Sequence, residues 1–264
     1  MDSTSFIIMI VKAIVVAVML IQVVPVMLWV ERRGSALMQN RLGPNRVGPM
    51  GLFQALADAL KFLSKEHPIP AHVHKWYYVA APLVSLLPAF MAFAAVPFAA
   101  PIHLGSGLTI PMQTADLNVG LLYIFAVGSL GVYGIIMGGW SSNSKYALLG
   151  SLRSSSQMIS YELSLGLSVI GILMVFQTLS LGEIAAAQAQ PLMEIAGVTI
   201  PRWGIFIQPL AFFIFMTASY AETNRLPFDL PEGESEIGAG YDSGYGPAGF
   251  AVFKTAAYVN MTTS

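Results

Sequence analysis

Residues 6–30 read FIIMIVKAIVVAVMLIQVVPVMLWV, and this stretch decides the class of fold. Only Lys12 and Gln22 interrupt its apolar run. A helix needs about 20 apolar residues to cross the hydrocarbon core of a bilayer, so the stretch predicts a first membrane span. The residues before this stretch include Asp2 and no basic segment. The apolar run is also too long for a signal peptide, so we expect no cleaved leader.

Further apolar segments repeat this pattern along the chain. A sixth stretch begins at about residue 248 but reaches only Tyr258, which is too short to cross. The sequence therefore predicts an all-α, polytopic transmembrane helix bundle, a single domain over residues 1–264, with five full spans and a partial sixth. The four full spans after the first are predicted at 77–100, 117–139, 160–178 and 204–222.

Composition supports a membrane protein and excludes several functions. The 264 residues are 55% hydrophobic and 10% charged, whereas soluble proteins carry roughly 25% charged residues. A net charge of −1 offers no field that would recruit nucleic acid. The chain has no cysteine, so it holds no disulfide, thiolate metal site or iron–sulfur cluster of its own. Any electrons must reach it from another chain.

The distribution of cations between loops predicts the orientation. Lysine and arginine are concentrated in the odd-numbered loops, which favours a cytoplasmic side for these loops and an external N-terminus. Ten cations lie in the odd loops (Arg32, Arg33, Arg41, Arg46, Lys61, Lys65, Lys75, Lys145, Arg153 and Arg225), whereas the even loops hold only Arg202.

The first cytoplasmic loop has a pattern of its own. Residues 42–51 read LGPNRVGPMG, a glycine–proline framework typical of a loop with defined turns. Residues 52–63 then predict an amphipathic helix in the membrane interface, because Gln54, Asp58 and Lys61 form one polar stripe. From spacing alone, Asp58 is either a surface ion-pair partner of Lys61 or part of a site.

Acidic residues gather where the fifth predicted span ends. Five of the fourteen acids lie within residues 222–236: Glu222, Asp229, Glu232, Glu234 and Glu236. Carboxylates beside a bilayer are costly, so the group is a candidate functional site, and neighbouring carboxylates share protons. The alternatives are a solvated loop, or simple pairing of Asp229 and Glu232 with Arg225. Pro227 and Pro231 favour irregular backbone buried in protein.

Glu162 lies inside the fourth predicted span. An acid in that position belongs either to an ion pathway or to a structural pair with a cation from another helix. His67, His72 and His74 share one loop, but no further acid or histidine completes a metal site at helical spacing.

Three motifs together resemble one family. They are residues 39–61 (QNRLGPNRVGPMGLFQALADALK), Ser160-Tyr-Glu162, and residues 222–236 (ETNRLPFDLPEGESE). They closely resemble the quinone-site membrane subunit of respiratory complex I, known as the H subunit in the bacterial NADH–quinone oxidoreductase and as subunit 1 in the mitochondrial enzyme. The resemblance runs in order from about residue 6 to residue 261.

The resemblance implies eight spans, a quinone tunnel at the junction with the peripheral arm, and a carboxylate path into the membrane. It implies that a first group of residues lines or supports the quinone channel: Arg32, Arg41, Asp58 and Arg225. A second group is implied to form the proton path: Glu222, Asp229, Glu232, Glu234 and Glu162. Under this resemblance Asp58 is a site residue rather than a surface ion pair.

The resemblance also implies the surroundings of the chain. Quinone is a substrate, while NADH, flavin and iron–sulfur clusters belong to partner subunits. The expected partners are the peripheral-arm iron–sulfur subunits, neighbouring membrane subunits and the lipid bilayer, with no nucleic acid. The expected location is the inner (plasma) membrane of a bacterium rather than the mitochondrial inner membrane.

The chain departs from the family pattern at its C-terminal end. It stops within the sixth span, which indicates a C-terminally truncated product, and Gly244 and Ala257 stand where the family usually has acids. Lys254 stands where an apolar residue is expected. Two alternatives to the oxidoreductase function remain. Related membrane-bound hydrogenases share these motifs in their membrane anchor subunits, and the truncated end is compatible with a non-catalytic scaffold.

Overall fold

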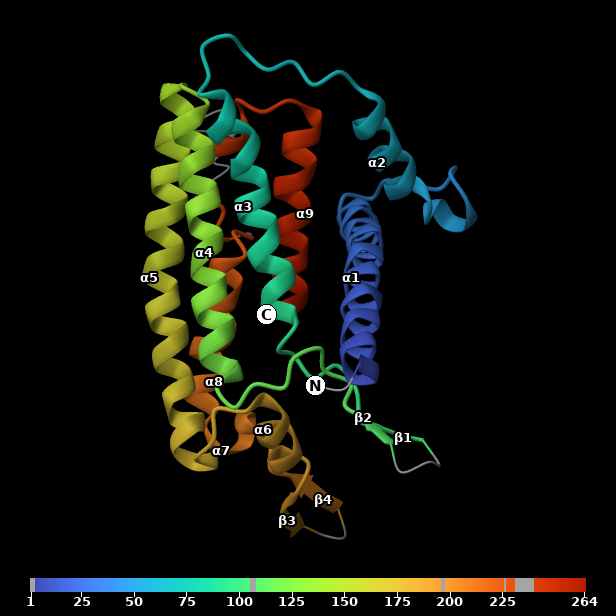
Figure 1. Ribbon diagram of the computed structural model, residues 1–264, viewed down its shortest axis with the longest axis vertical. Coiled ribbons are helices and arrows are strands. Elements are labelled where there is room, and N and C mark those ends of the chain that lie inside the picture. Colours follow the sequence, from blue (N-terminus) through green and yellow to red (C-terminus); the bar gives the residue numbers. More distant parts are fainter. Residues whose placement is uncertain (1–2, 105–107, 196–197, 226, 231–239) are drawn as a thin grey trace.

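The computed structural model describes residues 3–104, 108–195, 198–225, 227–230 and 240–264, and helices dominate it (Figure 1). Within these described residues, four helices are long and apolar enough to cross a membrane, which confirms the predicted all-α, polytopic membrane fold. They are α1 (Ser3–Met38), α3 (Lys75–Phe93), α4 (Gly120–Ser141) and α5 (Lys145–Phe176).

Helices α3, α4 and α5 lie side by side, with α4 between the other two (Figure 1). Small residues allow them to approach closely, as is common between membrane helices. A methyl group at Gly134 of α4 would lie only 2.5 Å from the backbone nitrogen of Ser85 on α3. A methyl group at Gly139 of α4 would collide with the side chain of Ser151 on α5. Glycine at these positions therefore sets the spacing of the bundle.

The fifth predicted span, 204–222, is divided in two. Helix α7 (Gly204–Ile207) ends at Gln208, which has φ −138° and ψ 68°, and α8 (Pro209–Glu222) begins with Pro209. Proline is favoured at the first position of a helix, where its missing N–H has no partner to lose. With 14 residues, α8 is shorter than the roughly 20 needed to span.

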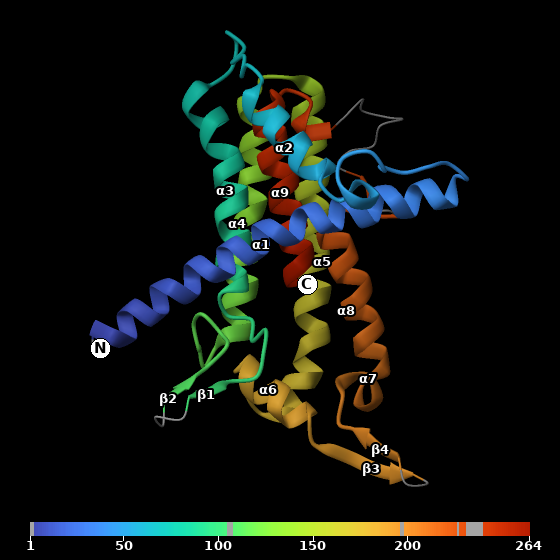
Figure 2. The same ribbon diagram turned by 90° about the vertical axis from the view of Figure 1, so that its right-hand side faces the viewer.

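Helix α9 (Pro247–Thr263) extends past the predicted end at Tyr258 and packs mainly on α3. Figure 2 shows α9 beside the upper part of the bundle and α8 beside the lower part of α5. Helices α8 and α9 therefore lie at different heights along the bundle. The segment that joins them begins at mid-height. The end of α8, where the predicted acidic cluster starts, therefore lies at mid-height of the bundle.

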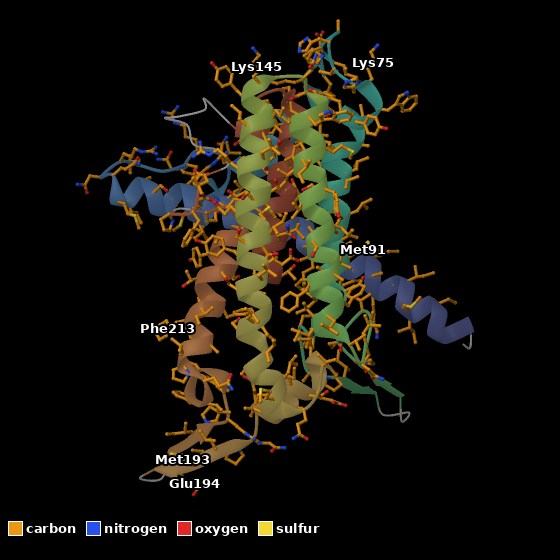
Figure 3. All side chains as sticks on the ribbon, turned by 90° about the vertical axis from the view of Figure 1, so that its left-hand side faces the viewer. Lys75, Met91, Lys145, Met193, Glu194 and Phe213 are labelled. Carbon is orange, nitrogen blue, oxygen red and sulfur yellow. The ribbon has the colours of Figure 1, made fainter. Side chains whose placement is uncertain are left out.

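Helix α1 crosses the bundle obliquely (Figure 2). Its buried face, with Leu20 only 1% exposed, packs against α3 and α9 in one core cluster. Its other face is exposed and apolar, as expected for a lipid-facing helix. Met91 of α3 and Phe213 of α8 also project outward from the bundle (Figure 3).

The two ends of the bundle differ. One end carries two short hairpins, β1–β2 (Ile102–Leu104, Leu108–Ile110) and β3–β4 (Pro191–Ile195, Val198–Pro201), with helix α6 (Leu181–Gln188). Both hairpins are antiparallel, and the sequence reasoning predicted no strands there. Figure 3 shows Glu194 of β3 at this end and Lys75 and Lys145 at the opposite end.

The amphipathic helix is confirmed as α2 (Gln54–Ser64), which packs against α1 and α9. Two short 3₁₀ turns complete the described elements. They are η1 (Pro49–Gly51), just before α2, and η2 (Gly240–Asp242), just before α9.

Candidate functional site

The glycine–proline loop places its backbone against α1. Gly48, Met50 and Gly51 all have positive φ, at 74°, 54° and 76°. A side chain at Gly51 would collide with the backbone of Pro44, so only glycine fits this turn. The loop is held because Trp29 Nε1 and Arg33 Nη1 each donate a 3.0 Å hydrogen bond to Met50 O.

Arg32 and Asp58 form an ion pair between α1 and α2. Arg32 Nη1 lies 2.5 Å from Asp58 Oδ2, and Gln54 Nε2 donates to Asp58 Oδ1 at 3.1 Å. Burial raises the pKa of Asp58, but the bonds from Arg32 and Gln54 outweigh it, so the net pKa lies below the ordinary value. Arg32 is the ion-pair partner that the structure shows for Asp58, and Lys61 adds a Coulombic attraction that ranks last among the causes of the lowered pKa.

Arg41 does not join this pair. Its Nε donates to Gln39 Oε1 at 2.6 Å, and the side chain is exposed. The structure therefore brings together Arg32 and Asp58 from the predicted quinone-channel group, while Arg41 lies on the surface beyond the end of α1.

Helix α8 ends in a turn that Gln157 of α5 holds in place. Asn224 has φ 51°, the left-handed conformation common just past the end of a helix. Gln157 Nε2 donates to Ala221 O and Phe228 O, each at 2.8 Å, so one buried amide bonds both the last turn of α8 and the segment beyond it. This arrangement fixes where Glu222 and Arg225 point.

Arg225 reaches across to α1 and α9. Its Nη1 donates to Glu31 Oε1 at 2.8 Å, and its guanidinium lies 4.5 Å from the centre of the Tyr258 ring. Tyr258 OH donates to Glu31 Oε2 at 2.5 Å. Glu31, Arg225 and Tyr258 therefore form one cluster. It joins α1, the segment after α8, and α9.

Glu31 was missed by the sequence reasoning. It directly precedes Arg32 and Arg33, so the count of cations in this loop concealed it. A single acid beside two arginines at the end of a span was the available signal. The ion-pair partner that the structure shows for Arg225 is Glu31, and Asp229 interacts with Arg225 through Coulombic attraction.

Two aspartates lie in the segment between α8 and α9. Asp229 Oδ1 and Asp242 Oδ2 are buried and have no hydrogen-bond partner among the described residues. Burial raises the pKa of Asp229, although the cations Lys254 and Arg225 oppose the rise. Burial also raises the pKa of Asp242 to about 6; its own backbone N–H opposes this and the charge of Asp229 adds to it.

Asp242 is only 4% exposed and was also missed by the sequence reasoning. It lies beyond the acidic cluster as the sequence defined it, among glycine and tyrosine residues. Only the packing of η2 against α4 and α5 shows that this aspartate is internal.

Glu162 and Glu222 approach the same short stretch of α4 from α5 and α8. Ser129 Oγ is hydrogen bonded to Glu162 Oε1. A methyl group on the adjacent Gly128 would lie 3.6 Å from Glu222 Oε1. The two carboxylates are close enough to repel one another electrostatically. Of the two alternatives for Glu162, the structural ion pair is not the one observed: within the described part of the chain its partner is a serine hydroxyl.

The predicted proton-path residues Glu232 and Glu234, with Glu236, lie outside the described residues. The others fall into two groups. Glu162 and Glu222 are brought together inside the bundle, while Asp229 lies near Arg225 and Lys254. Arg32 and Asp58 form their own pair at the start of the chain.

Fold and site together define a polytopic helical membrane protein. It has carboxylates inside the bundle and an arginine-containing glycine–proline loop after α1. Residues 10–264 match the NADH dehydrogenase family, and the chain belongs to that family. Its relatives are named as H subunits of NADH-quinone oxidoreductase, which supports a membrane subunit of complex I.

Three of these relatives show the extent of the similarity. The protein of Bdellovibrio bacteriovorus is 46% identical over 95% of this chain and 69% of its own length. The protein of Thermomicrobium roseum is 48% identical over 89% of this chain and 68% of its own length. A protein of Geobacter metallireducens is 46% identical over 98% of this chain and 75% of its own length.

Proposed function

We propose that this protein forms part of the quinone-binding site of a bacterial NADH-quinone oxidoreductase and couples quinone reduction to proton translocation. The electrons arrive from iron–sulfur centres of partner subunits, because this chain has no cysteine to hold a cluster. The names of the relatives favour this function over a hydrogenase anchor. The proposed location is the bacterial inner membrane, with the N-terminus outside.

Arginines near the end of α1 and just after α8 supply the groups that a reduced quinone requires. Arginine is always charged and donates hydrogen bonds in a planar fork, which suits the oxygens of a quinone as they gain negative charge. Arg32 is held in place by Asp58, and Arg225 is held by Glu31 and Tyr258. Arg41 lies on the surface beyond the end of α1, where a partner protein would cover it.

One observation carries the proton-coupling part of the proposal: Glu162 and Glu222 face the same place on α4 inside a membrane helix bundle. Ionisable residues inside a membrane are costly and mark ion or proton pathways. From Glu222 the turn held by Gln157 leads to Arg225 and Asp229. In this proposal, charged groups lead from Arg225 and Asp229, after α8, to Glu222 and Glu162 inside the bundle.

The coupling is electrostatic. Negative charge on the quinone attracts the guanidinium group of Arg225 and weakens its attraction for Asp229. Asp229 then binds a proton more readily, since a nearby cation favours the ionised form of a carboxyl. Repulsion between Glu162 and Glu222 favours a single shared proton, so a change at one end of the path alters proton occupancy at the other.

The test replaces Glu162 or Glu222 with glutamine in the whole complex, reconstituted in vesicles. Glutamine keeps the shape but cannot ionise, so we expect NADH oxidation with a soluble quinone analogue to release far fewer protons per NADH. Glu194→Gln, an exposed acid on β3 at the opposite end, is the matched control. Wild-type proton release in both glutamine variants, with the iron–sulfur subunits still co-purifying, would refute the proposal.

A further inference from the structure

Ser129 occupies a special place between the two internal carboxylates. It lies on α4 next to Gly128, which faces Glu222, and its own hydroxyl contacts Glu162. The same oxygen lies 2.8 Å from Phe125 O, one turn earlier on α4. One hydroxyl thus has two acceptors within hydrogen-bond distance, a side-chain carboxylate and a backbone carbonyl.

A hydroxyl has a single hydrogen but also accepts hydrogen bonds. When Glu162 is ionised, Ser129 donates its hydrogen to the carboxylate. When Glu162 carries a proton, its carboxyl O–H donates a hydrogen bond to Ser129 Oγ and keeps the proton, and the serine O–H turns to donate to Phe125 O. Glu162 keeps its hydrogen bond in both states, and Ser129 itself neither gains nor loses a proton.

We propose that Ser129 is a positioning residue that keeps Glu162 hydrogen bonded in both protonation states, so that Glu162 exchanges protons without an unsatisfied carboxyl in the bundle. The inference rests on the proposed proton-coupling function. Its physical basis is that a buried polar group left without a partner is strongly disfavoured. Without the hydroxyl, one protonation state of Glu162 loses its partner on α4, and the exchange slows.

Gly131 offers a matched control two residues further along α4. A methyl group there would have no neighbour within 4 Å among the described residues outside the local helix backbone. Gly131→Ala therefore adds bulk to the same helix without touching Glu162, Glu222 or the hydroxyl of Ser129.

The experiment compares Ser129→Ala, Ser129→Thr and Gly131→Ala in the intact complex in sealed vesicles. Two quantities are measured: the rate of electron transfer from NADH to a soluble quinone analogue, and the protons released per NADH. We expect Ser129→Ala to lower coupled proton release roughly tenfold, the scale expected for losing a hydrogen bond to a charged group. Ser129→Thr, which retains the hydroxyl, and Gly131→Ala should release protons as the wild type does.

The outcomes separate this inference from the proposed function. Normal proton release in Ser129→Ala, with Glu162→Gln defective, overturns the role of Ser129 and leaves the proposed function intact. Equal loss in Ser129→Ala and Ser129→Thr also overturns it, since only packing would then matter. Normal release in Glu162→Gln overturns the proposed function itself. If Ser129→Ala does not assemble, Ser129→Cys keeps the volume with a weaker donor, and wild-type release in it refutes the role.

Discussion

At the scale of single residues, the site consists of charges brought together from distant parts of the sequence. Glu31 and Arg225 are separated by 194 positions and Glu31 and Tyr258 by 227, yet the three form one cluster. The motifs identified Arg225 as important but not its partner. Charge type can be read from a sequence, whereas the partner of a charge depends on which helices pack together.

The burial of Asp242 can be tested by measuring how protein stability depends on pH. Its pKa in the folded protein is about 6, above the ordinary 3.8, so the folded state holds the proton more tightly. The cost of ionising Asp242 is absent below pH 3.8, grows as the pH rises, and is complete above about 6. Asp242→Asn should therefore raise stability at pH 8 by about 2–3 kcal/mol.

The measurement is the thermal unfolding of the detergent-solubilised chain between pH 4 and pH 8. The gain from Asp242→Asn should disappear at pH 4. Asp58→Asn is the control with the opposite sign, because the pKa of Asp58 is lowered and its ionised form stabilises the fold. If Asp242→Asn shows no gain at pH 8, the aspartate is not buried as described.

At the scale of elements, breaks in the helices place the site. The break at Gln208 and the end of α8 at Glu222 leave that carboxylate at mid-height beside α5. Apolar content predicted one span over 204–222, because hydropathy does not detect where a chain turns. Pro209 was the available signal. The amphipathic helix was predicted well, since its polar stripe is a local pattern.

Gly244 lies where a larger side chain has no room. A methyl group there would lie 2.7 Å from Ser142 Cβ, and Ser142 is only 1% exposed. Gly244→Glu, which restores the acid of the family pattern, should therefore destabilise the chain by about 1–3 kcal/mol through overpacking. Ala257→Glu, at the other departure from the family pattern, is the comparison. Thermal unfolding measures both, and equal stability of Gly244→Glu and the wild type would contradict the packing.

At the scale of the whole molecule, the two ends of the bundle carry different charges. Lys75 and Lys145 lie at one end and Glu194 at the other (Figure 3). The positive-inside rule then predicts that the lysine end faces the cytoplasm. The membrane fold as a whole was predicted from apolar length, and this long-range charge asymmetry comes from loop composition.

Orientation is directly testable because the chain has no cysteine. Single-cysteine variants Lys145→Cys and Glu194→Cys introduce one exposed thiol at each end. In intact cells a membrane-impermeant maleimide should label Glu194→Cys and leave Lys145→Cys unlabelled until the membrane is opened. The reverse labelling pattern would show that the chain has the opposite orientation and would contradict the prediction.

The sequence by itself determined that this is a helical membrane protein of the NADH dehydrogenase family, with three motifs typical of that family and an acidic cluster over residues 222–236. Apolar length, loop charge and motif spacing are local properties of the sequence. They can be read without knowing which residues are in contact. Only the tertiary structure decided that Arg225 pairs with Glu31, that Asp58 pairs with Arg32, and that Glu162 and Glu222 meet at Gly128 and Ser129. Such pairs depend on how helices far apart in the chain pack side by side, and packing is a property of the whole fold.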